Sequence, residues 1–245
     1  MTIRIETIAG TDLPLRPGGF PLPQDLRGQV PAVWAKMIAR NPTIWDGRLY
    51  GFTPPVVDAA GILRAEAMED DYSAHLAWRE AEFPEIGLCH MFVTAIICSS
   101  DGAIILGRMS GDTINAGRVY PPGGVLDPRD LGADGRIDAE RAIGFELNEE
   151  TGLHAADARK GALLAISDGP RMALGRVLHF DRTADALVQE ITATLEQQDE
   201  RELDAVVACR STADGRAAGN LAPYAEALLD AVFGGRIDLL RPRVW

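Results

Sequence analysis

The sequence predicts an α+β sandwich, because strand-like and helix-like segments follow one another in mixed order with hairpins among them. The clearest hairpin joins an apolar run at 91–100 to a second run at 103–110 through the turn residues Ser100-Asp101-Gly102. The later segments lack the regular strand–helix–strand order that a doubly wound parallel sheet requires. We therefore expect a sheet that contains hairpins and carries helices packed on it.

The chain is long enough for more than one structural unit. Its 245 residues exceed the roughly 100 to 200 that one domain usually needs. We expect residues 1–88 to form an N-terminal extension or small subdomain packed on a core domain of residues 89–245. Composition and spacing predict three features in the first part: a helix opened by Pro31 and ended by Asn41-Pro42, a turn at Asp46-Gly47, and a helix over 71–80.

The elements of the second part follow from hydrophobic spacing. Apolar runs predict strands, and apolar residues repeated every three or four positions predict helices. After the hairpin we expect, in chain order, a strand over 118–120, a helix over 139–151, strands over 163–166 and 173–180, a helix with Leu187, Ile191 and Leu195 on one stripe, a strand over 205–209 and a helix from Pro223. Asp138 can cap the 139–151 helix, and Gly152 can take the left-handed conformation that ends it.

Composition excludes several classes of function. The formal net charge is −12 and no cluster of Lys and Arg is present, so we expect no nucleic-acid partner. Three scattered cysteines suggest neither a disulfide framework nor a zinc site. No segment has the roughly 18 consecutive apolar residues of a membrane span, and no targeting segment is evident. We expect a soluble, cytoplasmic protein with no membrane partner.

Three carboxylates on the 139–151 helix indicate a metal site. Glu146, Glu149 and Glu150 stand at i, i+3 and i+4, so they share one face. Like charges this close repel one another unless a cation neutralises them, and a set of oxygen ligands suits Mg²⁺ or Mn²⁺. A solvated acidic face explains the helix alone equally well. The preceding Gly123-Gly124 favours the metal, because glycines let the backbone approach an ion or a phosphate closely.

Loop and helix together resemble the Nudix box, which reads Gly, five residues, Glu, seven residues, then Arg-Glu-apolar-any-Glu-Glu-any-Gly-apolar. Gly124, five residues and Asp130 are similar to the first half, and residues 146–153 match the second half in full. The sequence departs from the box in three ways. Asp130 replaces Glu, Phe145 replaces an Arg that pairs with a motif carboxylate in the family, and fourteen residues instead of seven separate these two positions.

The resemblance implies a Nudix-type α/β/α sandwich with a mixed sheet, preceded here by the N-terminal extension. It implies that Glu146, Glu149 and Glu150 are catalytic, and that together with Gly123 they bind Mg²⁺ or Mn²⁺. The substrate-binding residues expected around them are Arg118, Tyr120, Gly124, Asp127 and Asp130. The implied reaction is attack by a metal-activated water on a phosphorus of a nucleoside diphosphate linked to another group. Either Glu149 or an acid on a later loop would be the general base.

More loosely, segments outside the box resemble the UDP-glucose pyrophosphatase-like Nudix proteins, which implies a UDP-sugar or similar small-molecule nucleotide as substrate. Coenzyme A or ADP-ribose diphosphatase activity stays open, and so does a Nudix-fold nucleotide-binding protein without catalysis. Superfamily members often dimerise, so a homodimer is also open. Arg108, Arg118 and Arg171 could each bind a phosphate, although a solvated surface arginine is the commoner case. For Glu202, a solvated position is favoured over a distant base.

Overall fold

The computed structural model describes residues 3–42, 44–111 and 113–239. The strands are β1 (Arg4–Ile8), β2 (Gly10–Asp12), β3 (Arg48–Phe52), β4 (Val56–Val57), β5 (Ile62–Arg64), β6 (Ala67–Asp71), β7 (His90–Cys98), β8 (Ile104–Met109), β9 (Arg118–Tyr120), β10 (Ala158–Asp168), β11 (Arg171–Phe180), β12 (Leu203–Cys209) and β13 (Asn220–Leu221). The helices are α1 (Gln24–Arg40), α2 (Tyr72–Glu80), α3 (Ala139–Thr151), α4 (Ala184–Leu195), α5 (Thr212–Ala218) and α6 (Pro223–Phe233), with short 3-10 turns η1 (Pro128–Asp130) and η2 (Ala155–Asp157). This mixed order confirms the predicted α+β class.

The main sheet is mixed and runs in the order β1-β10-β11-β7-β8-β9-β13, with β12 also paired to β8. Its central strands β7 and β11 are parallel over their whole length. The predicted hairpin of β7 and β8 is present, but it pairs only Ile97 with Ile105 and Cys98 with Ile104. Along the rest of this edge, β7 bonds to the loop at 121–124, since Val93 and Ala95 donate to the carbonyls of Gly124 and Pro122. The sheet therefore holds the Gly-Gly loop directly.

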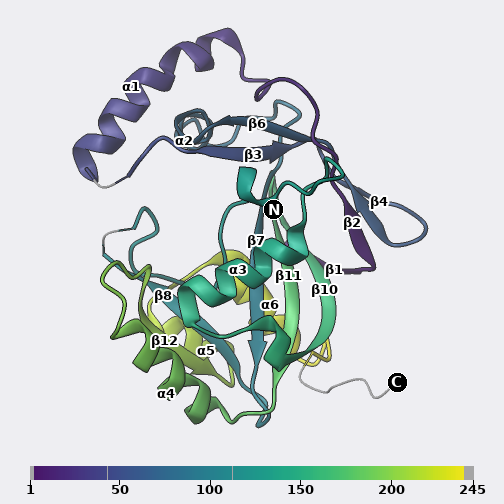
Figure 1. The fold of residues 1–245 in the computed structure, drawn as a ribbon, viewed down its shortest axis with the longest axis vertical. Coiled ribbons are helices and arrows are strands. Elements are labelled where there is room, and N and C mark those ends of the chain that lie inside the picture. Colours follow the sequence, from purple (N-terminus) through teal and green to yellow (C-terminus); the bar gives the residue numbers. More distant parts are fainter. Residues whose placement is uncertain (1–2, 43, 112, 240–245) are drawn as a thin grey trace.

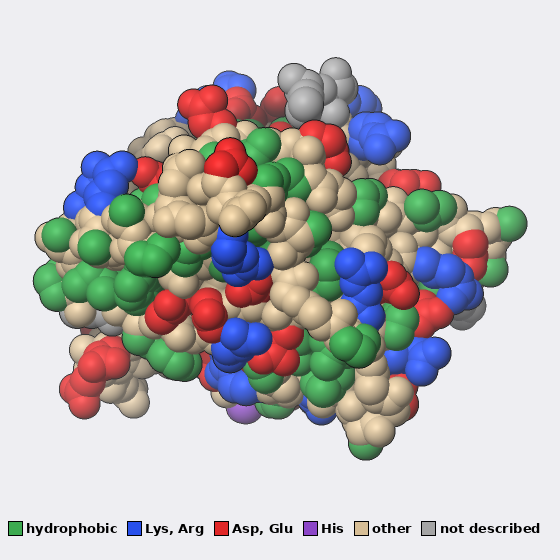
Figure 2. Space-filling view, turned by 90° about the horizontal axis from the view of Figure 1, so that it is seen from above, with side chains coloured by type: hydrophobic (Ala, Val, Ile, Leu, Met, Phe, Trp, Pro, Cys, Tyr) green, Lys and Arg blue, Asp and Glu red, His purple; other side chains and the backbone are tan. Residues whose placement is uncertain are grey.

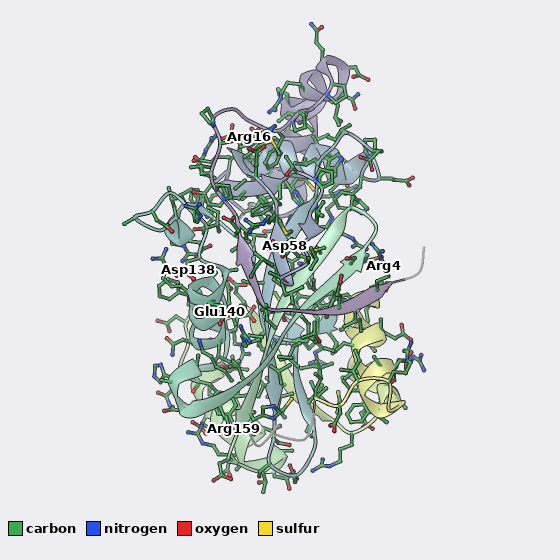
Figure 3. All side chains as sticks on the ribbon, turned by 90° about the vertical axis from the view of Figure 1, so that its right-hand side faces the viewer. Arg4, Arg16, Asp58, Asp138, Glu140 and Arg159 are labelled. Carbon is green, nitrogen blue, oxygen red and sulfur yellow. The ribbon has the colours of Figure 1, made fainter. Side chains whose placement is uncertain are left out.

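Helices cover both faces of this sheet, which makes an α/β/α sandwich as expected. Alternate side chains of β7 point to opposite faces, so Val93 packs in one apolar cluster and Ile96 in the other. The first cluster contains side chains of α3 and α4, and the second contains those of α6. Figure 3 shows this layering, with Asp138 and Glu140 on α3 at one side of the strands and α6 at the other.

The N-terminal part lies at one end of the main sheet (Figure 1). It forms two small sheets, one of β2, β5 and β4 and one of β3 and β6, and a cluster of its own around Trp78. It is also joined to the core, because β1 pairs with β10 and the Tyr50 N–H donates to the Leu126 carbonyl. The sequence does not predict β1 or β2. The division at residues 88 and 89 stays a prediction.

Helix α1 begins at Gln24, so Pro31 lies inside it and not at its start. A proline there removes one backbone hydrogen bond. Packing against α2 offsets that loss, with Leu26 and Met37 buried. Basic and acidic side chains are interspersed on the face shown in Figure 2. Ion pairs of the N-terminal part include those of Arg48 with Glu69 and Asp71. No helix in the described part of the chain is both long and apolar enough to cross a bilayer.

Candidate metal and substrate site

The loop at 121–124 is fixed against β7 by side-chain and backbone contacts. The Thr94 hydroxyl lies 3.0 Å from the carbonyl oxygen of Pro121 and 2.9 Å from that of Pro122. A Cβ atom on Gly123 would lie 2.1 Å from the Val93 carbonyl oxygen, so no larger residue fits there without moving the backbone. Gly123 is therefore required by close packing on the strand, and its N–H points to α3.

Glu150 lies in the last turn of α3 and is almost completely buried. Its Oε2 accepts a hydrogen bond from the Gly123 N–H at 2.8 Å, whereas its Oε1 is buried with no hydrogen-bond partner among the described residues. Burial, followed by the negative charges of Glu202 and Glu146, raises the pKa of Glu150 well above its usual value. A buried, half-satisfied carboxylate of this kind lacks a positive partner.

Glu146 lies one helical turn before Glu150 and packs against the next glycine of the loop. A Cβ atom on Gly124 would be 2.4 Å from the carboxyl carbon and from both carboxyl oxygens of Glu146. Burial, together with the charges of Glu202 and Glu149, raises the pKa of Glu146 to about 8. The loop thus positions two carboxylates, one through a hydrogen bond and one through a contact that only glycine permits.

Glu149 is oriented differently from the other two. Its side chain is 54% exposed, and its Oε1 lies 3.3 Å from a guanidinium nitrogen of Arg129. The predicted convergence of three glutamates is therefore incomplete. Within residues 3–42, 44–111 and 113–239, no group of three or more His, Cys, Asp or Glu side chains is arranged so that it could hold a metal ion. The physical reason is that Arg129 draws Glu149 outward, which leaves Glu146 and Glu150 as a pair.

A further carboxylate, that of Glu202, acts on this pair. Glu202 immediately precedes β12. The residue as a whole is exposed, yet partial burial of its carboxyl group and the charge of Glu149 raise its pKa. Its charge in turn acts on Glu146 and Glu150. The sequence around Glu202 shows no motif and therefore favours a solvated position for it. Pairing of β12 with β8 brings it to the site, and no local sequence signal reports that pairing.

Asp127 and Asp130 form a capping box around η1. Asp127 accepts from the Arg129 N–H at 2.7 Å, and the Asp130 carboxylate accepts from the Asp127 N–H at 3.0 Å. Asp130 is buried, and burial raises its pKa to about 6. Both carboxylates therefore hold the loop between the glycines and α3. The guanidinium of Arg129 also pairs with Asp127, and in this way it links the loop to Glu149.

A pocket of about 610 Å³ opens beside Gly123 and Gly124. Of the predicted substrate-binding residues, Arg118, Tyr120 and Gly124 line it, whereas Asp127 and Asp130 do not. Arg171, another of the three arginines expected to be able to bind a phosphate, also lines it. Arg108 lies elsewhere and pairs with Asp204 at the surface. The pocket is of a size typical for small-molecule sites, and it adjoins the glutamates through the two glycines.

Solved structures similar to this chain include three proteins from bacteria and an archaeon. The E. coli ORF135 protein is 25% identical over 64% of this chain and 95% of its own, with a TM-score of 0.38. The MutT protein from Methanosarcina mazei is 18% identical over 60% of this chain and 94% of its own, with a TM-score of 0.39. RenU, a Nudix hydrolase from M. smegmatis, is 16% identical over 63% of this chain and 89% of its own, with a TM-score of 0.40. No protein-family model and no curated protein matches the chain.

The pair formed by Glu146 and Glu150 fits a divalent cation on chemical grounds. Glu150 is buried and Glu146 is half-buried one turn before it, one Glu150 oxygen has no partner among the described residues, and neither side chain forms an ion pair with Lys or Arg there. A cation would stabilise both charged forms and satisfy the orphaned oxygen. Carboxylate and carbonyl oxygens are the ligands that Mg²⁺ and Mn²⁺ prefer. The residues present therefore suit the metal that the motif implies.

Proposed function

We propose that this protein is a metal-dependent hydrolase of the Nudix type, which cleaves the diphosphate bond of a nucleoside diphosphate linked to another group. The observation that carries the proposal is the pair of Glu146, half-buried, and Glu150, buried, against Gly123 and Gly124 at the edge of a ligand-sized pocket. These residues belong to the part of the chain that resembles the Nudix box. A UDP-sugar is the first substrate to test, because the weaker sequence resemblance points to it.

Glu146, Glu150 and the Gly123 carbonyl would hold Mg²⁺ or Mn²⁺, and Glu149 would complete the set after leaving Arg129. An exposed ion pair contributes at most about 1 kcal/mol, so a divalent cation can displace Arg129 from Glu149. When bound, the cation supplies positive charge to the phosphate oxygens and lowers the pKa of water. The chain's own contribution is to hold the ligands rigidly on α3 and on the loop along β7.

Glu202 is our candidate for the residue that accepts the proton of the attacking water. Its charge acts on Glu146 and Glu150, and its raised pKa makes it a stronger base than a carboxylate of ordinary pKa. In the reaction the water oxygen bonds to one phosphorus, the bond from that phosphorus to the bridging oxygen breaks, and the second phosphate leaves with that oxygen. The water proton passes to the Glu202 carboxylate. Arg118 and Tyr120 lie in the adjoining pocket, where they can contact the substrate.

The test is a panel of UDP-sugars, ADP-ribose, coenzyme A and dinucleotides, assayed with Mg²⁺ or Mn²⁺ for release of a nucleoside monophosphate or, from coenzyme A, of adenosine 3′,5′-bisphosphate. We expect metal-dependent turnover of at least one compound and its loss in Glu150→Gln. Glu202→Gln should lower kcat by about 100-fold or more while metal affinity changes little. Arg108→Gln, outside the site, serves as the control.

Two results would contradict the proposal. If none of the compounds gives a product with either metal, the protein is not this hydrolase. If nucleotides raise the melting temperature but are never cleaved, the chain is a nucleotide-binding protein built on the same site.

A further inference from the structure

The pocket beside the glycines has walls from both parts of the chain. The core contributes Arg118, Tyr120 and Arg171, and helix α2 with the turn after it contributes His75, Arg79 and Phe83. The N-terminal part therefore helps to form the cavity itself. A ligand bound at Gly123 and Gly124 would contact α2 on its far side.

Three arginines converge in this pocket from three different elements: Arg79 from α2, Arg118 from β9 and Arg171 from β11. Burial, followed by the positive charges of Arg118 and Arg171, holds the pKa of Arg79 below its usual value. Arg171 pairs with Asp168, but neither Arg79 nor Arg118 pairs with a carboxylate in the part of the chain that the structure describes. Converging guanidiniums that lack carboxylate partners form a binding site for an anion.

Few acidic groups accompany these arginines, and Glu80, whose charge raises the pKa of Arg79, is itself paired with Lys36. Besides Asp168, which Arg171 already occupies, the pocket lining contains only Glu82 among the described residues, and Glu82 is solvent exposed. The catalytic glutamates lie on the other side of Gly123 and Gly124. The arginine cluster therefore lines the pocket, whereas Glu146, Glu149 and Glu150 do not.

The turn after α2 is shaped to face this cluster. Glu82 and Phe83 both have positive φ, 62° and 56°, which is unusual for residues other than glycine. This conformation places Phe83 edge-on against Trp78 and beneath the guanidinium of Arg171, 5.7 Å from the ring centre. Strain of this kind persists only where surrounding contacts maintain it, and here it orients one of the three arginines.

The same pocket offers a polar atom and aromatic rings to a ligand. His90 lines it, and in the part of the chain that the structure describes the buried His90 Nδ1 has no hydrogen-bond partner. The Phe92 ring stacks on the His90 ring, with 5.6 Å between their centres. On its other side it contacts the Tyr224 ring, with 5.2 Å between centres. These rings can pack on a flat group of a ligand, such as a base.

We propose that the pocket binds a second anionic group of the substrate, separate from the scissile diphosphate, and that Arg79 of α2 recognises it together with Arg118 and Arg171. This inference rests on the proposed hydrolase function and specifies its substrate class. The substrate is a nucleoside diphosphate derivative that carries an additional phosphate or carboxylate. Helix α2 thereby makes the N-terminal part a specificity element of the enzyme.

The experiment compares pairs of compounds that differ only in the additional anion. Coenzyme A with dephospho-coenzyme A and NADPH with NADH test a phosphate, and UDP-glucuronate with UDP-glucose tests a carboxylate. In at least one pair, kcat/KM should be about tenfold or more higher for the charged member. Arg79→Gln should remove that preference and leave the rate on the uncharged member within about twofold, whereas Arg108→Gln should keep the preference. Equal kcat/KM within all three pairs, or an equal loss on both members in Arg79→Gln, would overturn the proposal.

Equilibrium binding in EDTA separates this inference from the hydrolase function. Calorimetry with the same pairs needs neither metal nor turnover, and the charged member should bind about tenfold more tightly to the wild type but not to Arg79→Gln. A preference in binding without hydrolysis of any compound would refute the hydrolase and retain the anion site. Hydrolysis without a preference for the charged member would retain the hydrolase and refute the anion site.

Discussion

The N–H of Gly123 lies 2.8 Å from Oε2 of Glu150, and this hydrogen bond joins the loop along β7 to the last turn of α3. The bond uses one oxygen of a buried carboxylate and leaves the other without a partner. Gly124 forms the second junction, since it leaves room for the carboxyl group of Glu146. The relative position of loop and helix therefore decides whether the two glutamates can share a cation.

Gly124→Ala should lower activity strongly while the protein remains folded. The added methyl would lie 2.4 Å from the Glu146 carboxyl group, so the side chain must move, and a misplacement of about 1 Å at a catalytic group costs about 100-fold in rate. Gly144→Ala is the matched control on α3, because nothing lies within 4 Å of its added methyl. That variant should keep wild-type kcat/KM and gain up to about 1 kcal/mol of stability. Equal kcat/KM in Gly124→Ala and wild type would refute the placement of Glu146.

Mg²⁺ or Mn²⁺ should stabilise the native protein. A cation that binds only the folded state adds about 2.7 kcal/mol when its concentration is 100 times the dissociation constant, so the melting temperature should rise on metal addition and fall again with EDTA. Glu150→Gln should abolish the rise, because it removes the charge on the carboxyl group that has the unpaired oxygen. A rise of the same size in Glu150→Gln would exclude Glu150 as a ligand.

Arg129→Gln should bind Mg²⁺ more tightly than the wild type. Arg129 holds Glu149 away from the other glutamates, and that exposed ion pair must break when Glu149 becomes a ligand. Since such pairs contribute up to about 1 kcal/mol, removing Arg129 should lower the dissociation constant by up to about fivefold in a calorimetric titration. Arg159→Gln, on a distant strand, should leave it unchanged. Unchanged affinity in Arg129→Gln would show that Glu149 does not leave Arg129 for the metal.

Acid should destabilise the protein partly through His75. This side chain is buried beside His90, and burial, then the charges of His90 and Arg79, hold its pKa well below the usual value. The unfolded chain takes up a proton as pH falls through about 6.5, while the folded protein does not, so the contribution of a neutral His75 is present above that pH and is lost below it. Between about pH 6 and 5 the wild type should lose about 1.4 kcal/mol per pH unit more than His75→Leu, measured by urea unfolding. Parallel stability curves would refute a neutral buried His75.

The sequence by itself determined the α+β class and the ends of α3, and it predicted which side chains share one face of that helix. These are local properties. Asp138 accepts from the Arg141 N–H at the start of α3, Gly152 is left-handed at its end, and the spacing of Glu146 and Glu150 fixes their common face. The glycines before the helix were identifiable for the same reason, because close approach of the backbone requires their residue type.

Only the tertiary structure decided which groups join that helix face. Glu149 has the spacing of a ligand, but Arg129 from η1 draws it outward. Glu202 has no motif, yet pairing of β12 with β8 delivers it to the site. Likewise, Arg79 reaches the pocket beside Gly123 and Gly124 because α2 packs at the end of the main sheet, although it lies far along the chain from Arg118 and Arg171. Such contacts depend on strand pairing and packing between distant segments, which the spacing of residues along one segment does not encode.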